Sequence, residues 1–500
     1  MISRRELPEP APARLFERRA DYPWFVVAAV CIGAFMGQVD ASIVQLALPS
    51  LESAFDAQVN AVSWVAVGYV LAFASALPVF ARLAEIAGRK TLYLGGFAFF
   101  TLWSALCGLA PDLPSLIAFR ILQGVGGALA GANSVVILVA AVGPARRGKA
   151  LGIMAAAQAV GLSIGPAAGG LILGTLGWRW IFWVTVPFGA LGFILAWLVV
   201  PKTTALAEDG RLDTIGAMLL IPAIATLLLA ITEWHAWGLS PPLVACVVAA
   251  PLLLGAFIWW EIRTPAPLID LNLFRSPAFS AGCVGVMVSY AMLYGIFFAM
   301  SFAFVRGYHD SPLAAGLRLT IVPVALGLVA PFGGALSDKR PRLVTLVGMA
   351  FCGLSALALA TTLDGAPNSL PTVMVYLAAF GAGLGLYIAP NNNATMCAAP
   401  AEKSGVAGGL LNLLRVFGTG VGVAAASTVL SWRLEAATGI HARTANAPEA
   451  ALLVAVGAAL VMLAALAALG GAMAMVRNDP EAGRREVGGH PVRSPQAAAS

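Results

Sequence analysis

Long apolar segments recur along this 500-residue chain and are separated by short polar loops. Each segment holds about 20 residues or more, the length that an α-helix needs to cross the hydrocarbon core of a bilayer. We therefore predict an all-α integral membrane protein with fourteen transmembrane helices. They fall at 24–48, 60–81, 91–110, 114–141, 149–174, 180–200, 214–233, 241–260, 278–303, 312–335, 342–363, 371–397, 405–432 and 450–475.

Positive charge alternates along the loops. Lys and Arg concentrate in the two tails and in every second loop, whereas the other side of the membrane holds only five Arg residues, in loops or near span ends (Arg179, Arg306, Arg318, Arg433 and Arg443). Loops rich in Lys and Arg remain in the cytoplasm. We therefore expect a multi-pass protein of the plasma (inner) membrane with both termini cytoplasmic, and we expect the N-terminal tail to be disordered.

Composition excludes several classes of function. The chain is 60% hydrophobic and only 11% charged, whereas a soluble domain carries about 25% charged residues. The loops are too short to hold a soluble enzyme domain, and no basic run is interleaved with aromatics. The segment GPARRGKA (143–150) has the spacing of a phosphate loop, but Ala150 stands where a Ser or Thr would bind magnesium. We expect no enzyme activity, nucleic acid, nucleotide, metal or cofactor.

Glycines indicate an internal repeat. One shift along the sequence places Gly124 on Gly381, Gly161 on Gly418 and Gly165 on Gly422. Repeated halves with a site between them are the architecture of alternating-access transporters. We divide the chain into an N-terminal tail (1–23), a six-helix half (24–200), two inserted helices with their loops (201–277), a second six-helix half (278–476) and a C-terminal tail (477–500).

Charged residues inside the spans are the strongest functional signal. Asp40 lies in the first span, and a carboxylate there costs roughly 2.5–3.5 kcal/mol to insert. It shares a helix face with Gly33 and Gly37, whereas Gln38 and Gln45 lie on roughly the opposite face. Two interpretations of Asp40 stay open: a structural ion pair, or a carboxyl that gains and loses a proton.

Other polar and aromatic side chains within the spans are candidates for a substrate or proton pathway. Arg120 in the fourth span stays charged, so it needs a carboxylate, carbonyl groups or water as its partner. The amides of the twelfth span should face a cavity or cap a break at Pro390. Helix–helix bonding and packing remain the alternative for this whole set. The pathway candidates are Gln38, Gln45, Gln123, Gln158, Tyr290, Tyr294, Asn391, Asn392, Asn412 and Arg415.

Several motifs carry a resemblance to a known family. The chain resembles the fourteen-helix drug:proton antiporters of the major facilitator superfamily in VDASIVQLALP, in RILQGVGGA, in GLSIGPAAGGL and in the loop ARLAEIAGRK. This resemblance implies that Asp40 and Arg120 couple transport to protons. It also implies a conformational latch at the cytoplasmic loops, formed by Glu85, Gly88, Arg89, Lys90 and Asp338. The loop departs from the family pattern at Ala81, Glu85 and Ile86.

The glycine signature of the fifth span has its own expected role. Gly161, Gly165 and Gly169 are spaced for close helix packing, and Pro166 and Gly170 complete the signature. In the family this pattern marks exporters, and the resemblance makes it a pliable interface between the two halves.

The resemblance therefore implies a proton-coupled antiporter that exports amphipathic, often cationic, organic compounds by alternating access, and we expect it to act as a monomer. A dedicated exporter of one metabolite, antibiotic or lipid is the first alternative. A receptor, a scaffold or an intramembrane enzyme is a distant one, because the loops are short and the four His residues lie near loops or tails.

Overall fold

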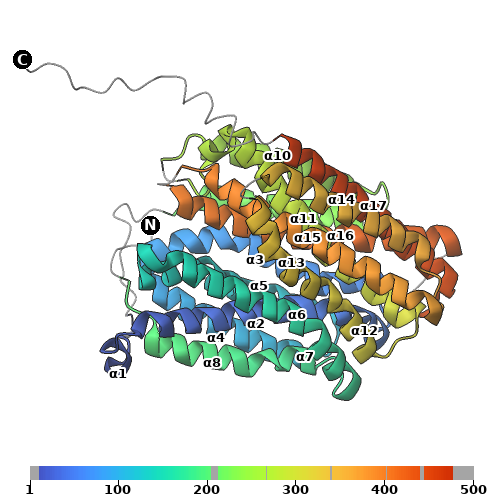
Figure 1. Cartoon of the computed structure of the whole chain (residues 1–500), viewed down its shortest axis with the longest axis horizontal. Helices are drawn as coiled ribbons and strands as arrows, with labels where there is room; N and C mark the ends of the chain where they lie inside the picture. Colours follow the sequence, from blue (N-terminus) through green and yellow to red (C-terminus); the bar gives the residue numbers. More distant parts are fainter. Residues whose placement is uncertain are drawn as a thin grey trace, which may run out of the picture.

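The computed structural model describes residues 9, 11–203, 212–265, 267–337, 340–400, 403–439 and 444–476. Within them the chain is all-helical, and fourteen helical segments are long and apolar enough to cross a membrane. The fold class and the number of spans predicted from the sequence are therefore confirmed. Figure 1 shows the long helices lying roughly alongside one another.

The spans have the following bounds: α2 (Tyr22–Phe55), α3 (Val59–Ala87), α4 (Arg89–Gly108), α5 (Leu113–Val142), α6 (Arg147–Thr175), α7 (Trp180–Trp183) with α8 (Thr185–Val199), α9 (Thr214–Trp237), α10 (Pro241–Glu261), α11 (Pro277–Phe302), α12 (Pro312–Leu319) with α13 (Ile321–Ser337), α14 (Pro341–Thr362), α15 (Leu370–Cys397), α16 (Ser404–Thr438) and α17 (Glu449–Met475). The short elements are α1 (Arg14–Glu17), η1 (Pro144–Arg146), η2 (Leu271–Arg275), the π-helical η3 (Ala303–Gly307), η4 (Pro367–Ser369) and η6 (Thr444–Asn446).

Several helices are longer than the apolar runs that predict them. The first span continues to Phe55 and the thirteenth to Thr438. Hydropathy detects the part of a helix inside the hydrocarbon, whereas backbone hydrogen bonding continues into the polar turns beyond it. Pro390 does not break the twelfth span, because α15 runs through it without interruption; neighbouring groups can satisfy the backbone that a proline frees in a membrane helix.

The spans form two bundles. Helices α2 to α8 pack on one another as the N-terminal bundle, and α11 to α17 do so as the C-terminal bundle. In Figure 1 the blue-to-green helices of the first lie below most of the yellow-to-red helices of the second. Helices α9 and α10 pack together, and α9 also contacts α3 of one bundle and α16 of the other.

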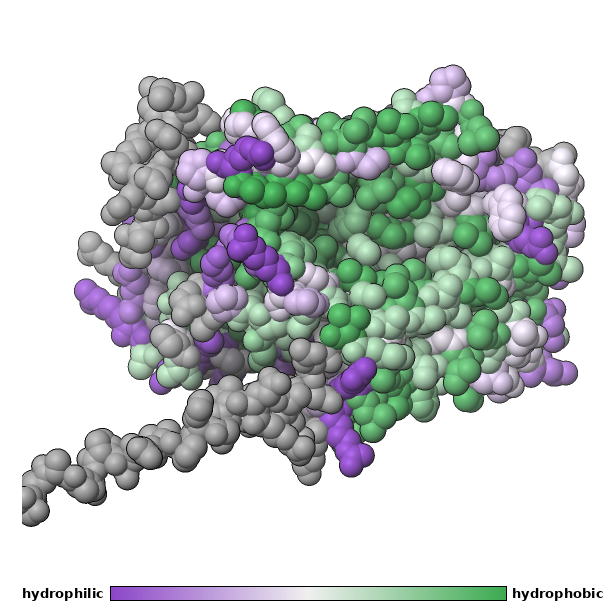
Figure 2. All heavy atoms as spheres, turned by 90° about the horizontal axis from the view of Figure 1, so that it is seen from above, coloured by the Kyte–Doolittle hydropathy of each residue, from purple (hydrophilic) through white to green (hydrophobic). Residues whose placement is uncertain are grey.

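The surface matches a membrane protein. Figure 2 shows a broad apolar band across the middle of one face, with hydrophilic residues gathered toward its two ends. We call the end at which α2 begins the basic end, because Arg82, Arg89, Arg146 and Arg147 lie there. The other end, where α2 finishes, is the opposite end.

Part of the N-terminal tail is docked on the N-terminal bundle. The backbone N–H of Ala13 donates to Leu198 O at 2.8 Å, and α1 follows directly. The Glu9 carboxylate accepts from the Thr203 backbone N–H at 2.6 Å. The expectation of a disordered tail is therefore wrong for residues 9 and 11–23, because backbone and carboxylate hydrogen bonds hold them to the end of α8.

The two bundles meet closely at the opposite end. Arg306 of η3 donates to the Pro49 carbonyl of α2 at 2.8 Å and also to the Ser53 hydroxyl. Glu52 accepts from the Thr444 backbone N–H at 2.7 Å. Hydrogen bonds from charged and polar groups therefore join the two bundles and close the structure at this end.

The glycine signature of α6 contacts both bundles. A Cβ at Gly161 would meet the Phe35 carbonyl of α2 at 2.6 Å, so the predicted smooth face packs inside the N-terminal bundle. A Cβ at Gly170 would instead meet the Pro312 carbonyl of α12 at 2.3 Å. The expected interface between halves is thus formed by the Pro166–Gly170 side of the helix and not by the face that begins at Gly161.

Candidate functional site

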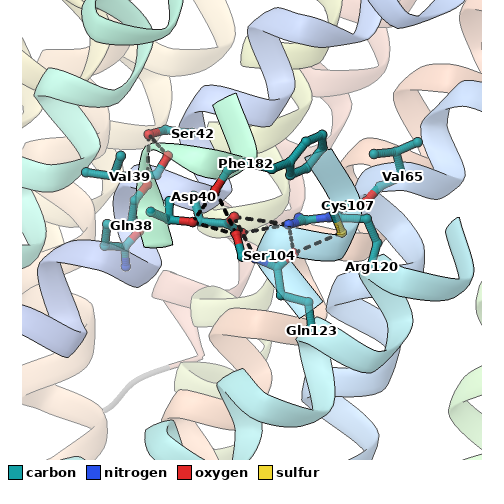
Figure 3. Close-up of polar contacts among 11 residues, drawn as sticks. Gln38, Val39, Asp40, Ser42, Val65, Ser104, Cys107, Arg120, Gln123 and Phe182 are labelled. Carbon is teal, nitrogen blue, oxygen red and sulfur yellow. Dashed lines mark hydrogen bonds and ion pairs between the residues drawn. The ribbon is translucent and has the colours of Figure 1, made fainter. Parts of the chain in front are cut away.

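A buried ion pair lies in the middle of the N-terminal bundle. One terminal nitrogen of Arg120 on α5 approaches both carboxylate oxygens of Asp40 on α2, at 3.1 and 2.9 Å. The exposed fractions of these side chains are 1% and 0%. Figure 3 shows Asp40 of α2 pointing toward Arg120 and Gln123, which both extend from α5. A guanidinium and a carboxylate that lose their hydration need such direct pairing.

Neutral groups complete the shell of this pair. Gln123 donates to Asp40 at 3.2 Å and accepts from Arg120 at 2.7 Å. Arg120 Nε donates to the Val65 carbonyl at 3.0 Å. The guanidinium also lies over the ring of Tyr69, 4.3 Å from its centre, a favourable cation–π geometry. Both buried side chains therefore have hydrogen-bond partners from α2, α3 and α5 in this conformation.

The faces of α2 direct its polar residues to different neighbours, as the spacing predicts. Asp40 faces α5, whereas a Cβ at Gly165 of α6 would meet the Ser42 hydroxyl. Gln38 faces the C-terminal bundle, where Tyr294 donates to its side-chain oxygen at 3.1 Å. One helix therefore carries the ion pair, the packing contact and a bond to the other bundle on three sides.

A central cavity with a free volume of about 120 Å³ adjoins the ion pair. Six predicted pathway residues line it: Gln38, Gln158, Tyr290, Tyr294, Asn412 and Arg415. Tyr69 also lines the cavity, so the residue that lies against Arg120 forms part of its wall. The cavity lies between the two bundles, on the basic-end side of the contacts that close the opposite end.

Four other candidates lie elsewhere. Gln123 belongs to the ion-pair shell, and the buried side-chain oxygen of Gln45 accepts no hydrogen bond from the described part of the chain. Asn391 donates to the Gly282 carbonyl of α11 at 3.1 Å, so it bonds two helices inside the C-terminal bundle. The buried oxygen of Asn392 has no hydrogen-bond partner among the described residues. None of these four lines the central cavity.

Among the residues that the structure describes, Glu85, Arg89 and Lys90 of the expected latch bond within the N-terminal bundle. Glu85 pairs with Arg82 at 2.7 Å, and Arg89 lies 4.0 Å from Glu85. Lys90 is fully buried and donates to the carbonyls of Trp197 and Val200, where it caps the end of α8. Gly88 has φ +105°, a conformation that favours glycine. Asp338 lies outside the described residues.

Sequence reasoning missed two features of this arrangement. Tyr69 carries no motif, and only its place in a span beside small residues could have marked it. Arg306 entered the sequence analysis only as a loop charge and Glu52 not at all, although their opposite signs at the ends of adjacent bundles are the signal for a closing contact.

A family model described as Major Facilitator Superfamily matches residues 30–423. The chain belongs to this superfamily, and it is a membrane transporter and not an enzyme.

Curated relatives cover most of the chain. It is 30% identical to the riboflavin transporter RibZ of Clostridioides difficile, over 80% of this chain and 87% of that one. It is 32% identical to the multidrug resistance protein Stp of Mycobacterium tuberculosis, over 83% of this chain and 77% of that one. One of these relatives is thus named for a single compound and the other for resistance to many drugs.

Solved structures share the fold. A bacterial homologue of the lysosomal transporter Spinster, in an inward-facing and unoccupied conformation, matches with a TM-score of 0.65 and 15% identity. The match covers 92% of this chain and all of that one. At this identity the likeness concerns architecture alone.

Proposed function

We propose that this transporter is a proton-driven exporter of amphipathic organic compounds. The observation that carries the proposal is the buried Asp40–Arg120 pair, whose guanidinium packs on Tyr69 in the wall of a cavity lined by aromatic and amide side chains. Ionisable residues inside a membrane are costly, and they commonly mark proton relays or substrate pathways. Multidrug efflux relatives at about 30% identity support the direction of transport.

Asp40 is the proposed proton carrier. In the conformation described here Arg120 neutralises its ionised form, which is the state expected after a proton has left. Protonation would remove the carboxylate charge, so Arg120 would lose its main partner and the wall at Tyr69 would be free to rearrange. One charge that crosses a potential of 100 mV supplies about 2.3 kcal/mol, enough to bias two packed states.

The orientation follows from the Lys and Arg distribution. We place the basic end and both termini in the cytoplasm and the closed end outside the plasma membrane. In this orientation the structure is closed to the outside, so the central cavity belongs to the cytoplasmic access state. Glu85, Arg89 and Asp338 would act as the latch of the other state, and the Pro166–Gly170 side of α6 as the pliable contact with α12.

The second candidate function is dedicated export of one metabolite. It is favoured by the relative named as a riboflavin transporter. A panel of unrelated toxic compounds separates the candidates, because broad efflux predicts sensitivity of a deletion strain to many of them and dedicated export to one.

Flux measurements in proteoliposomes test the coupling. We expect an imposed pH gradient to drive substrate accumulation by wild type, and Asp40→Asn to bind substrate but respond to no gradient. Asp364→Asn, in an exposed loop, is the matched control and should behave as wild type. Equal gradient-driven flux by Asp40→Asn and wild type would place the proton site elsewhere.

A further inference from the structure

The central cavity is charged on one wall only. Arg415 of α16 lines it, and no Asp or Glu does among the residues that the structure describes. The nearby Asp40 does not offset this charge, because it is buried against Arg120. A ligand in the cavity therefore meets a net positive site, although the sequence led us to expect cationic substrates.

The guanidinium of Arg415 is only partly satisfied. Its Nε and one terminal nitrogen donate to the Asn412 side-chain oxygen at 3.2 and 2.7 Å. Arg415 makes no ion pair with a described carboxylate, whereas Arg120 pairs with Asp40. A guanidinium carries five N–H donors and stays charged at every physiological pH. The remaining donors of Arg415 are therefore free to bind a ligand at the cavity wall.

The surrounding rings define the rest of the ligand. Arg415 lies 5.7 Å from the ring centre of Tyr290. The cavity is also lined by further aromatic side chains, namely Tyr69, Phe73, Tyr93, Phe100 and Tyr294. At the repeat-related position of α6 stands Gln158, a neutral amide. Flat apolar surface, one cation and several amides fit a planar ring that bears an anionic group.

We propose that Arg415 binds a carboxylate or similar anion on an aromatic substrate and that Asn412 holds the guanidinium in position. This proposal rests on the proposed function only in treating the central cavity as the substrate site. Arg–carboxylate hydrogen bonds are charge-assisted and roughly twice as strong as neutral ones. A cation of the same shape would be repelled by Arg415 and would find no carboxylate in the cavity wall.

Equilibrium binding of two matched ligands tests the proposal without any proton gradient. The ligands are 2-naphthoate and 2-naphthylmethylammonium, measured by calorimetry on the purified full-length protein in detergent. We expect wild type to bind the anion at least about tenfold more tightly, a difference of about 1.4 kcal/mol. Arg415→Gln should lower this preference to about twofold or less, and Arg415→Lys should keep part of it.

The matched control lies on the same helix. Arg433 of α16 is exposed and does not line the cavity, so Arg433→Gln should keep the full preference. Tighter binding of the cation, no binding of the anion by folded wild type, or an unchanged preference in Arg415→Gln would each overturn the proposal. The binding measurement uses no proton gradient, so a retained anion preference without gradient-driven flux would count against the transport proposal alone.

Discussion

The two bundles differ most at one matched position in their centres. Gly161 faces Phe35 across α6 and α2, and its repeat partner Gly418 faces Met287 across α16 and α11. The same step along the sequence that leads from Phe35 to Met287 leads from Asp40 to Met292, so Met292 holds the position equivalent to Asp40. Likewise, Gly124 of α5 faces Tyr69, and its repeat partner Gly381 of α15 faces Val322. The same step along the sequence that leads from Gly124 to Gly381 leads from Arg120 to Leu377. The N-terminal bundle thus carries an ion pair where the C-terminal bundle carries two fully buried apolar side chains.

This difference separates the two interpretations of Asp40. The architecture packs Met292 and Leu377 at the matched place, so a charge there is not required to build such a bundle. Replacement of a buried ion pair by apolar residues is often neutral or stabilising. This comparison supports the proposed function of the Asp40–Arg120 pair, and it yields three stability predictions that test it.

The largest effect is expected when one partner of the pair is removed. Arg120→Leu leaves the Asp40 carboxylate buried without a cation, which should cost about 3–5 kcal/mol of unfolding free energy. SDS titration of the protein in mixed micelles measures this loss. At the matched position Leu377→Met should cost less than about 1.5 kcal/mol, because volume and polarity are nearly kept. Equal losses at both positions would contradict the comparison.

A smaller effect is expected at the matched glycines. A Cβ at Gly422 would meet the Ala291 carbonyl at 2.1 Å, whereas the first atom met at Gly165 is the Ser42 hydroxyl oxygen. Because backbone cannot move aside but a hydroxyl can rotate, Gly422→Ala should cost about 2–3 kcal/mol and Gly165→Ala less than about 1 kcal/mol. The same SDS titration compares the two variants, and a reversed order would show that α11 yields more easily than α2.

These matched sites also show how far the sequence can lead. Span number, the faces of α2 and the convergence of Gln38, Gln158 and Arg415 on one cavity follow from periodicity and repeat position. The neighbouring element that each helix face contacts does not follow from them. A small or polar residue can satisfy itself against any neighbouring backbone, as Lys90 does at the end of α8 and Asn391 does at Gly282. Such contacts depend on three-dimensional packing that spacing alone does not encode.

The smallest change in stability is expected from the variant that copies the C-terminal bundle into the N-terminal one. Asp40→Met combined with Arg120→Leu removes both charges together and fills the site with the side chains found at the matched position. We expect its unfolding free energy to lie within about 1.5 kcal/mol of wild type.

The double variant should lose gradient-driven transport although its stability is kept. The double variant should fold, yet show no gradient-driven flux in proteoliposomes, because no carboxyl remains at the proposed proton site. Arg120→Leu alone should be less stable than the double variant, although it carries fewer substitutions. A double variant that unfolds as readily as Arg120→Leu would show that the ion pair holds the N-terminal bundle together, and the functional interpretation of Asp40 would then lose its main physical support.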